Sequence, residues 1–262
     1  METEKQLSPE VISELEHPYF ELQASWGMTK HMGGLKATRE LIELCHINKG
    51  KYVLVVGCGV GITACYIAKG YGCRVVGVDI LERMVERANE RAKREGVEGR
   101  VEFRVADAQD LPFEDNLFDV VIGEWITGLL DDKQRGTNEY LRVVKPGGCV
   151  GLNEGIWIKT PPPTELVEYL SRIFGAKGEI LTSDGWEELL VGTGLRDMVV
   201  RTYKADVLSE KRENLKDFLR VWHRALYAYI RSSAFRKFIR VALSLPKDFL
   251  EYWGYGIYVG RK

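Results

Sequence analysis

Residues 51–79 have the sequence KYVLVVGCGVGITACYIAKGYGCRVVGVD, and this stretch decides the fold. Its apolar run 52–56 is short and rich in β-branched residues, which is typical of a buried parallel strand. Glycines follow at alternate positions, a helical pattern begins at Ile62, and a second apolar run from Arg74 ends in Asp79. This order of strand, glycine loop, helix and strand predicts the first unit of a doubly wound α/β sheet.

The glycine loop and the acidic residue beyond it favour a ligand with an adenosine group. Glycines let the backbone approach a ligand and present amides at a helix N-terminus. Asp79, about 20 positions further on, is placed to accept hydrogen bonds from a ribose. The spacing Gly57-x-Gly59-x-Gly61 departs from the dinucleotide pattern G-x-G-x-x-G, which would need a glycine in place of Ile62. A tight turn without a ligand is the structural alternative.

Residues 53–61, VLVVGCGVG, resemble the first motif of the class I S-adenosylmethionine (SAM) dependent methyltransferases, V-L-[D/E]-[VIL]-G-C-G-x-G. The family usually has an acidic residue at the position of Val55, where it helps to hold the SAM amino group. The resemblance implies SAM as the cofactor and S-adenosylhomocysteine as its product. The cofactor-binding residues that it implies are Gly57, Cys58, Gly59, Gly61, Asp79, Ile80, Asp107, Ala108, Glu124 and Trp125.

Three later segments resemble family motifs in the expected order. Residues 106–113, ADAQDLPF, are similar to D-A-x-x-L-P-F, in which the acidic side chain, here Asp107, usually accepts from the adenine amino group. A local turn capped by Asp107 is the alternative. Residues 117–123 match the F-D-x-V strand. Residues 140–148 resemble the L-[RK]-x-L-K-P-G-G turn before strand five, which we expect at 149–153. The ordered set is more specific than any single motif.

Glu124 and His31 are the candidate catalytic residues. Glu124 follows the strand at 117–123, and ligands of open α/β sheets bind beyond the carboxyl ends of strands. We therefore expect Glu124 near the reacting methyl group or the SAM amino group, where it would offset the missing acid at Val55; a solvated carboxylate is the alternative. His31 begins HMGGLKAT, which resembles the H-P-G-G-L-x-A-T of a subset of small-molecule methyltransferases, with Met32 in place of the proline.

The whole chain predicts one α/β domain with a Rossmann-like, seven-stranded, mostly parallel sheet and an antiparallel last strand. Its expected parts are an N-terminal helical cap at 1–50, a core at 51–204 and 254–262, and a helical insertion at 205–250. The insertion is either a helical pair packed on the body or a lid over the substrate, with a basic face that a membrane surface would also attract. The basic residues are Arg212, Lys216, Arg220 and Arg224. The candidate substrate residues are Tyr19, Trp26, Trp222 and Tyr255. A simple N-terminal brace is the alternative for Tyr19, Trp26 and His31.

Composition narrows the class of protein. The 262 residues carry a net charge of −1, which argues against a general nucleic-acid binder. The five cysteines form no C-x-x-C pair and the four histidines show no ligand spacing, so we expect no metal site and a reducing, cytoplasmic environment. The polar N-terminus is no signal peptide, and the longest uncharged run contains the glycine loop, so no membrane span is expected.

Three functions remain open at this stage. The first is a SAM-dependent methyltransferase that acts on a small molecule by direct displacement. The second is a SAM-binding regulatory or assembly module without catalysis, which the valine at position 55 keeps under consideration. The third is an RNA or protein methyltransferase, against which the absence of an N-P-P-[YF] signature after the fourth strand argues. The acceptor, its methylated atom and the oligomeric state are left open by the sequence.

Overall fold

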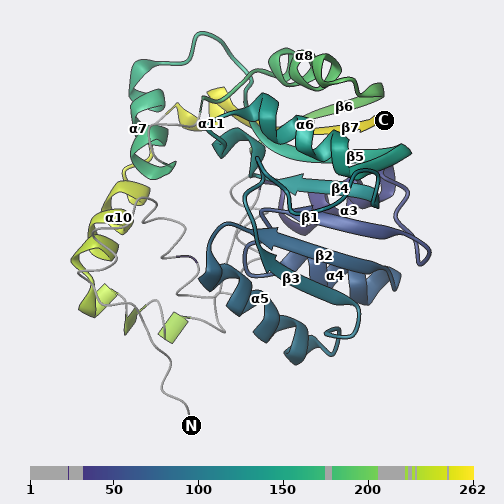
Figure 1. The fold of residues 1–262 in the computed structure, drawn as a ribbon. Helices are drawn as coiled ribbons and strands as arrows, with labels where there is room; N and C mark the ends of the chain where they lie inside the picture. Colours follow the sequence, from purple (N-terminus) through teal and green to yellow (C-terminus); the bar gives the residue numbers. More distant parts are fainter. Residues whose placement is uncertain are drawn as a thin grey trace.

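A computed structural model gives the fold (Figure 1). A seven-stranded sheet with the order β3-β2-β1-β4-β5-β7-β6 forms its centre. The strands are β1 (Tyr52–Val56), β2 (Arg74–Asp79), β3 (Val101–Val105), β4 (Phe118–Glu124), β5 (Val144–Trp157), β6 (Arg196–Lys204) and β7 (Trp253–Arg261). The structure describes residue 23 and residues 32–174, 179–205, 222–223, 226–227, 229–246 and 248–262.

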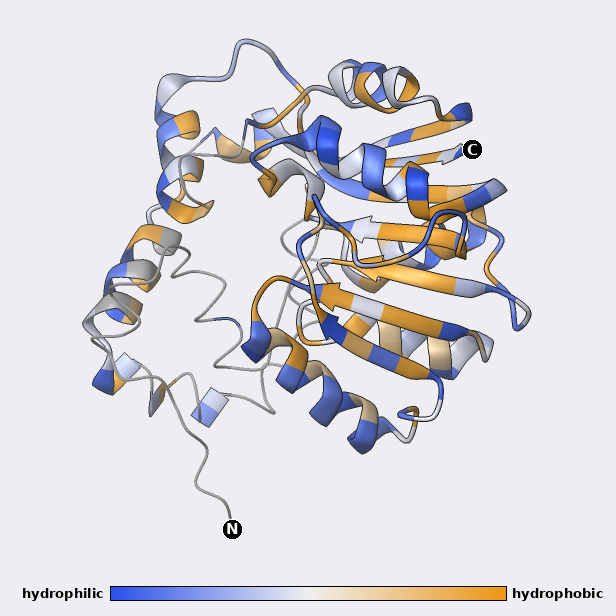
Figure 2. Ribbon diagram, viewed as in Figure 1, coloured by the Kyte–Doolittle hydropathy of each residue, from blue (hydrophilic) through white to orange (hydrophobic). Residues whose placement is uncertain are grey.

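The direction of the strands confirms the predicted fold class. Strands β1 to β5 pair in parallel, whereas β7 lies antiparallel between β5 and β6. The β-branched runs of β1 and β2 are buried almost throughout, as expected for parallel strands covered on both faces. Figure 2 shows the apolar residues concentrated in these central strands, with hydrophilic residues on the outer surface of α5.

Helices cover both faces of the sheet. One hydrophobic core lies between the sheet and α3, α4 and α5, and a second lies between the opposite face and α6 and α8. The helices are α3 (Gly34–Leu44), α4 (Ile62–Tyr71), α5 (Glu82–Glu95), α6 (Lys133–Val143), α7 (Thr164–Phe174), α8 (Ser183–Thr193), α10 (Ser233–Leu243) and α11 (Phe249–Tyr252), with a short 3-10 turn η1 (Thr127–Leu129).

Strand β5 is much longer than the sequence predicts. Lys145-Pro146-Gly147-Gly148 was expected to be a turn before a strand at 149–153, but the strand already begins at Val144. Its pairing with β4 shifts register between Phe118 and Val120, and this irregularity takes up the extra residues. The strand then continues to Trp157, four residues beyond the predicted end, because it pairs with β7 over its whole second half.

The third group of helices lies at one end of the sheet. In Figure 1 the arrowheads of β2 and β4 point toward the side where α7 and α10 lie, so these helices stand beyond the carboxyl ends of the parallel strands. Helix α10 lies against α7, and α11 leads directly into β7. Helix α10 lies within the segment 205–250, in which the described residues at 222–223, 226–227 and 229–231 are also helical. The four basic residues predicted on this segment, Arg212, Lys216, Arg220 and Arg224, lie outside the described residues.

Candidate cofactor and acceptor site

The glycine loop has the backbone that its sequence predicts. Gly57, Gly59 and Gly61 all have positive φ values, of 62°, 52° and 78°. A Cβ atom on Gly57 would lie 2.6 Å from Cγ1 of Ile126, so this position also lacks room for a side chain. Gly61 is the N-cap residue of α4, which places the loop at a helix N-terminus.

Asp79 holds the loop from the end of β2. Its Oδ2 accepts a hydrogen bond from the Gly59 amide at 2.8 Å, and its Oδ1 accepts from the Leu81 amide at 3.1 Å. The buried Cys58 also joins the loop to β2, because its amide donates to the carbonyl of Val78, the residue before Asp79, at 2.8 Å. Asp79 therefore connects the glycine loop to the turn before α5, in addition to its predicted role toward a ribose.

Glu124 lies at the carboxyl end of β4 between two helices. Thr38 of α3 donates its hydroxyl hydrogen to Oε1 at 2.8 Å, and Thr63 of α4 donates to Oε2 at 2.5 Å. Both threonines are buried. The carboxylate is thus held in one orientation beside the first turn of α4, directly after the glycine loop. Thr38 is the last residue of the segment HMGGLKAT, whereas Thr63 belongs to no quoted motif. Neither was identified as a partner of Glu124, because each lies on a different helix far from Glu124 in the chain.

Asn153 is a second polar residue at this edge that the sequence analysis missed. It pairs with Glu124 across β4 and β5, and its side chain is fully buried. Its Nδ2 donates to the Met32 carbonyl at 2.8 Å, whereas its Oδ1 has no hydrogen-bond partner among the described residues. A buried acceptor without a donor costs free energy, so this oxygen is suited to a ligand that carries N–H or O–H groups. The sequence feature that could have identified Asn153 is its place at the end of the apolar run 149–152.

The predicted adenine-binding segment forms a turn after β3. Asp107 accepts from the Gln109 amide at 2.8 Å through Oδ1, so the expected local cap is present. Ala108 is buried, whereas Ile80, next to Asp79, is 60% exposed. An exposed isoleucine beside a ribose acceptor offers an apolar surface to a flat ring. The adenine role of Asp107 and Ala108 stays a prediction.

The aromatic candidates occupy different places. Trp125 has a positive φ of 60° and packs against Phe174 of α7 and Trp253 of β7, with ring centroids 5.5 Å and 5.6 Å away. Tyr255 is buried and stacks on Tyr203 at 5.0 Å. Trp222 is half exposed. The predicted residues Tyr19, Trp26 and His31 lie outside the described residues.

Glu154 is a further residue that the sequence analysis missed. It follows Asn153 but faces the opposite side of the sheet, where it is fully buried. Its Oε1 accepts from the amides of Ile126 and Thr127 at 3.2 Å and 2.8 Å, and its Oε2 accepts from Gly128 at 3.3 Å. Burial raises the pKa of Glu154 to about 7, although these hydrogen bonds oppose the shift. The rule that directed attention to Asp79 and Glu124, an acid at the carboxyl end of a strand, also applies to Glu154.

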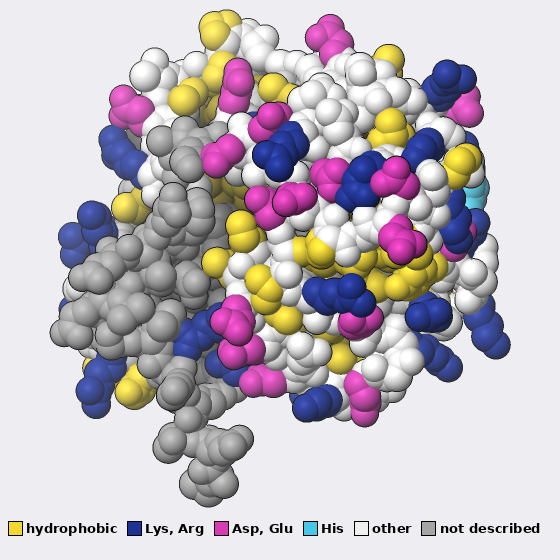
Figure 3. All heavy atoms as spheres, in the orientation of Figure 1, with side chains coloured by type: hydrophobic (Ala, Val, Ile, Leu, Met, Phe, Trp, Pro, Cys, Tyr) yellow, Lys and Arg dark blue, Asp and Glu magenta, His cyan; other side chains and the backbone are white. Residues whose placement is uncertain are grey.

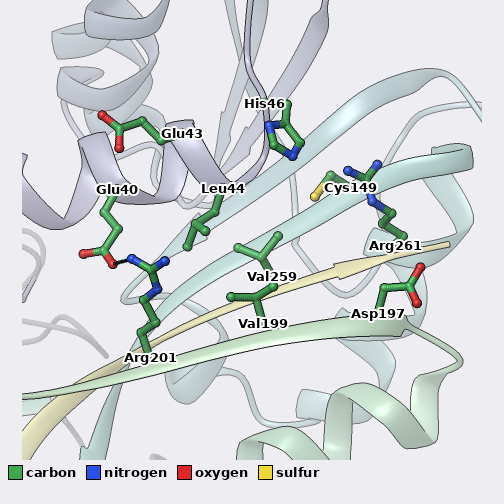
Figure 4. Close-up of a pocket in the computed structure, with 10 residues that line it drawn as sticks. All are labelled: Glu40, Glu43, Leu44, His46, Cys149, Asp197, Val199, Arg201, Val259 and Arg261. Atoms are coloured by element: carbon green, nitrogen blue, oxygen red, sulfur yellow. Dashed lines mark hydrogen bonds and ion pairs between the residues drawn. The ribbon is translucent and has the colours of Figure 1, made fainter.

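A separate hollow of about 230 Å³ runs along β6 and β7 from Arg261 to Arg201 (Figure 4). It lies between the end of α3 and strands β6 and β7, and an ion pair of 2.6 Å between Arg201 and Glu40 closes one side. Its Cys149 precedes Asn153 by four residues, roughly 13 Å along an extended strand. This hollow is therefore distinct from the site at the carboxyl edge.

The groups at the carboxyl edge fit SAM. The glycine loop leaves room for close approach of a ligand to the backbone, and Asp79 offers a carboxylate for ribose hydroxyls. Glu124 and the unpartnered Oδ1 of Asn153 offer acceptors for an ammonium group. Among the residues described, no group of three or more His, Cys, Asp or Glu side chains is arranged to hold a metal ion.

Comparison with known proteins identifies the family. A family model for a methyltransferase domain matches residues 53–148. An uncharacterized protein of Haemophilus influenzae is 32% identical over 181 residues, which are 68% of this chain and 72% of that protein. Phosphoethanolamine N-methyltransferase 3 of Arabidopsis thaliana is 31% identical over 195 residues, 71% of this chain but only 39% of the plant protein. The chain belongs to the class I SAM-dependent methyltransferases, and SAM is its cofactor.

Solved structures agree on the fold. Phosphoethanolamine N-methyltransferase 2 of Haemonchus contortus, in complex with phosphomonomethylethanolamine and S-adenosylhomocysteine, gives a TM-score of 0.73 at 21% identity. The match covers 97% of this chain and 60% of that chain. In the part of this chain that the structure describes, no helix is long and apolar enough to cross a membrane.

Proposed function

We propose that this protein transfers the methyl group of SAM to a small-molecule acceptor by direct displacement. The observation that carries the proposal is the fixed carboxylate of Glu124, held by Thr38 and Thr63 next to the glycine loop. Bound SAM supplies a methyl group that its sulfonium already makes electrophilic. The protein's own task is to align the acceptor with that carbon, which can contribute several kcal/mol to lowering the barrier.

The residues divide into those that hold the cofactor and those that surround the acceptor. Asp79 accepts from the ribose, Asp107 and Ala108 bind the adenine, and Glu124 and Asn153 face the amino-acid part of SAM. The N-terminal cap and the insertion 205–250 form the walls around the acceptor. The proposed wall residues are Tyr19, Trp26, His31, Trp222 and Tyr255. A general base is required only for an acceptor that is protonated at the working pH.

Surface charge supports a small-molecule acceptor over a nucleic acid. On the face shown in Figure 3, basic and acidic side chains are interspersed over the described surface, which does not favour a polyanion. The proposal includes a cytoplasmic location, which the five cysteines support because all of them are free and buried.

Two measurements test the proposed function in sequence. Calorimetry with purified protein should show binding of SAM and S-adenosylhomocysteine; failure of both to bind at about 1 mM, roughly −4 kcal/mol, would contradict it. A cell extract is then incubated with the protein and SAM that carries an isotopically labelled methyl group. Mass spectrometry should find a labelled small molecule that is absent without protein. Binding without any labelled product would instead support a SAM-binding module that lacks catalysis.

A further inference from the structure

A small cavity borders Glu154 on the side of the sheet opposite Glu124. Its volume is about 30 Å³, enough for about two water molecules or one small polar group. It lies between the turn after β4, the end of β5, α7 and α8. The lining residues are Trp125, Gly128, Leu129, Glu154, Gly155, Leu170, Phe174, Ile180 and Trp186.

The lining combines aromatic rings with one carboxylate. Trp125, Phe174 and Trp186 come from the turn after β4, from α7 and from α8. Aromatic rings attract organic cations through the negative faces of their π-systems. Glu154 is the single charged residue among the lining residues that the structure describes. Aromatic rings around one acidic group select a cation over an anion or a neutral polar group.

The walls of this cavity are held in place. The indole nitrogen of Trp186 donates to the Gly155 carbonyl at 3.2 Å, which fixes its ring against β5. Trp125 is fixed through its amide, which donates to the Asn153 carbonyl at 2.8 Å. A preformed cavity needs little reorganisation to bind a ligand, which favours specific recognition.

Among the residues that the structure describes, the other titratable groups around Glu154 leave its charge largely uncompensated. Lys133 of α6 interacts electrostatically with Glu154, but Glu179 and Asp131 share this cation, and burial lowers the pKa of Lys133. Tyr140 and Tyr258 are phenols near the same carboxylate; burial raises the pKa of both, and the charge of Glu154 raises them further. Neither supplies a positive charge. A buried carboxylate without a closely paired cation is costly, and a bound cation would offset that cost.

We propose that this cavity binds a small ammonium group on the methyl acceptor. This inference rests on the proposed function and deepens it, because it assigns the acceptor to the class of organic amines. Trp125 directly follows Glu124, so an acceptor held here extends from the cavity toward the edge where the cofactor binds. The Thr127 hydroxyl also donates to Glu154, in addition to the three backbone amides. Because an ionised carboxylate offers about four acceptor sites, Glu154 would attract the ammonium group through its charge and not through a free lone pair.

The test uses propylammonium as a probe and propan-1-ol as its neutral counterpart. Each is titrated into the isotopically labelled full chain while the tryptophan indole N–H signals are followed by NMR. We expect propylammonium, but not propan-1-ol, to shift the Trp125 signal, which the variant Trp125→Leu assigns by its loss. Affinity should rise as the pH increases from 6 to 8, because Glu154 loses its proton in this range while the probe stays charged.

Two variants make the result specific. Glu154→Gln should weaken the binding of propylammonium at least tenfold and abolish its pH dependence. Glu188 is an exposed acid on α8, so Glu188→Gln should leave both the affinity and its pH dependence unchanged. If Glu154→Gln does not fold, the pH series and Trp125→Leu still decide the question. Equal binding of both probes, or an affinity that does not change with pH, would overturn the inference. Calorimetry with SAM on the same sample separates the two possible failures. If only the cation site is wrong, SAM still binds; if the proposed function is wrong, SAM does not bind.

Discussion

The Thr63 hydroxyl donates a hydrogen bond of 2.5 Å to Oε2 of Glu124, and this contact joins the first turn of α4 to the end of β4. Thr63 is two residues beyond the last loop glycine, so any movement of the loop also affects the carboxylate. Thr38 holds the other oxygen from α3. The contact therefore connects the glycine loop, the N-terminal part of the fold and the carboxyl edge of the sheet at one side chain.

Replacing the Glu124 carboxylate by an amide should impair the cofactor site without unfolding the protein. In Glu124→Gln an NH2 group replaces one carboxylate oxygen and faces a threonine hydroxyl that donated to that oxygen. The negative charge that would attract the ammonium group of SAM is also lost. We expect SAM affinity to fall by about 1–3 kcal/mol, the range for hydrogen bonds to charged groups. Calorimetry measures the affinity and thermal unfolding checks the fold. Unchanged affinity and unchanged turnover would remove Glu124 from the site.

Asp79 should matter both for the ribose and for the loop. Asp79→Ala removes the acceptor of the Gly59 and Leu81 amides, so it should weaken SAM by about 1–3 kcal/mol and also lower the melting temperature. Asp79→Asn keeps one carbonyl oxygen and should lose affinity with a smaller loss of stability. Calorimetry and thermal unfolding of both variants separate the two roles. NADH should not compete with SAM, because the glycine spacing differs from the dinucleotide pattern.

Gly57 should be intolerant of a side chain for two separate reasons. Its positive φ costs an alanine about 1–2 kcal/mol, and the new Cβ would also meet Ile126 at 2.6 Å. Gly96 is a matched control, because its φ of 67° is similar but no heavy atom lies within 4 Å of a Cβ built there. Urea unfolding should show a larger loss for Gly57→Ala than for Gly96→Ala, and only the former should weaken SAM. Equal losses would show that the contact with Ile126 relaxes.

The sequence predicts what depends on local pattern and misses what depends on pairing between distant segments. The apolar runs 52–56 and 74–78 indicate buried parallel strands by themselves, and the glycines between them indicate the loop. The contacts of Glu124 require α3 and α4 to converge on β4, which no local spacing encodes. The early start of β5 depends on a register shift against β4. Asn153 and Glu154, by contrast, were open to prediction, because polar residues that interrupt an apolar run at a strand end were already the signal for Glu124.

Glu154 should make folding stability depend on pH. Its pKa is about 7 in the folded protein, against 4.5 for an ordinary glutamate. Between about pH 4.5 and about pH 7 the folded state keeps a proton on Glu154 that the unfolded state has lost. The contribution of Glu154 to folding stability therefore decreases as the pH rises through this range and then levels off. The difference in unfolding free energy between Glu154→Gln and the wild type should therefore shift in favour of the variant by on the order of 3 kcal/mol from pH 5 to pH 8. Urea titrations at both pH values measure it, and a difference independent of pH would refute the shift.

The segment around residues 222–230 should become buried when the acceptor site is filled. Trp222, Leu226, Tyr229 and Ile230 are 50%, 49%, 47% and 65% exposed, and so many apolar side chains close together are unusual on a surface without a binding role. The neighbouring α10 lies against α7, whose Phe174 contacts Trp125 at the site. We expect the segment, which precedes α10 in the chain, to close over the carboxyl edge, exclude water and enclose the acceptor.

Hydrogen exchange of the full chain tests this closure. We expect the amides of 222–243 to become protected with S-adenosylhomocysteine and the labelled acceptor found in cell extract, more than with S-adenosylhomocysteine alone. Amides in β3, the edge strand at the opposite side of the sheet from β6, serve as the internal control and should not change. Sedimentation with anionic liposomes tests the alternative, in which the segment binds a membrane surface as an interfacial helix. Protection by liposomes that fades with salt, without protection by the two ligands, would show that this segment contacts a membrane surface instead of closing over the acceptor.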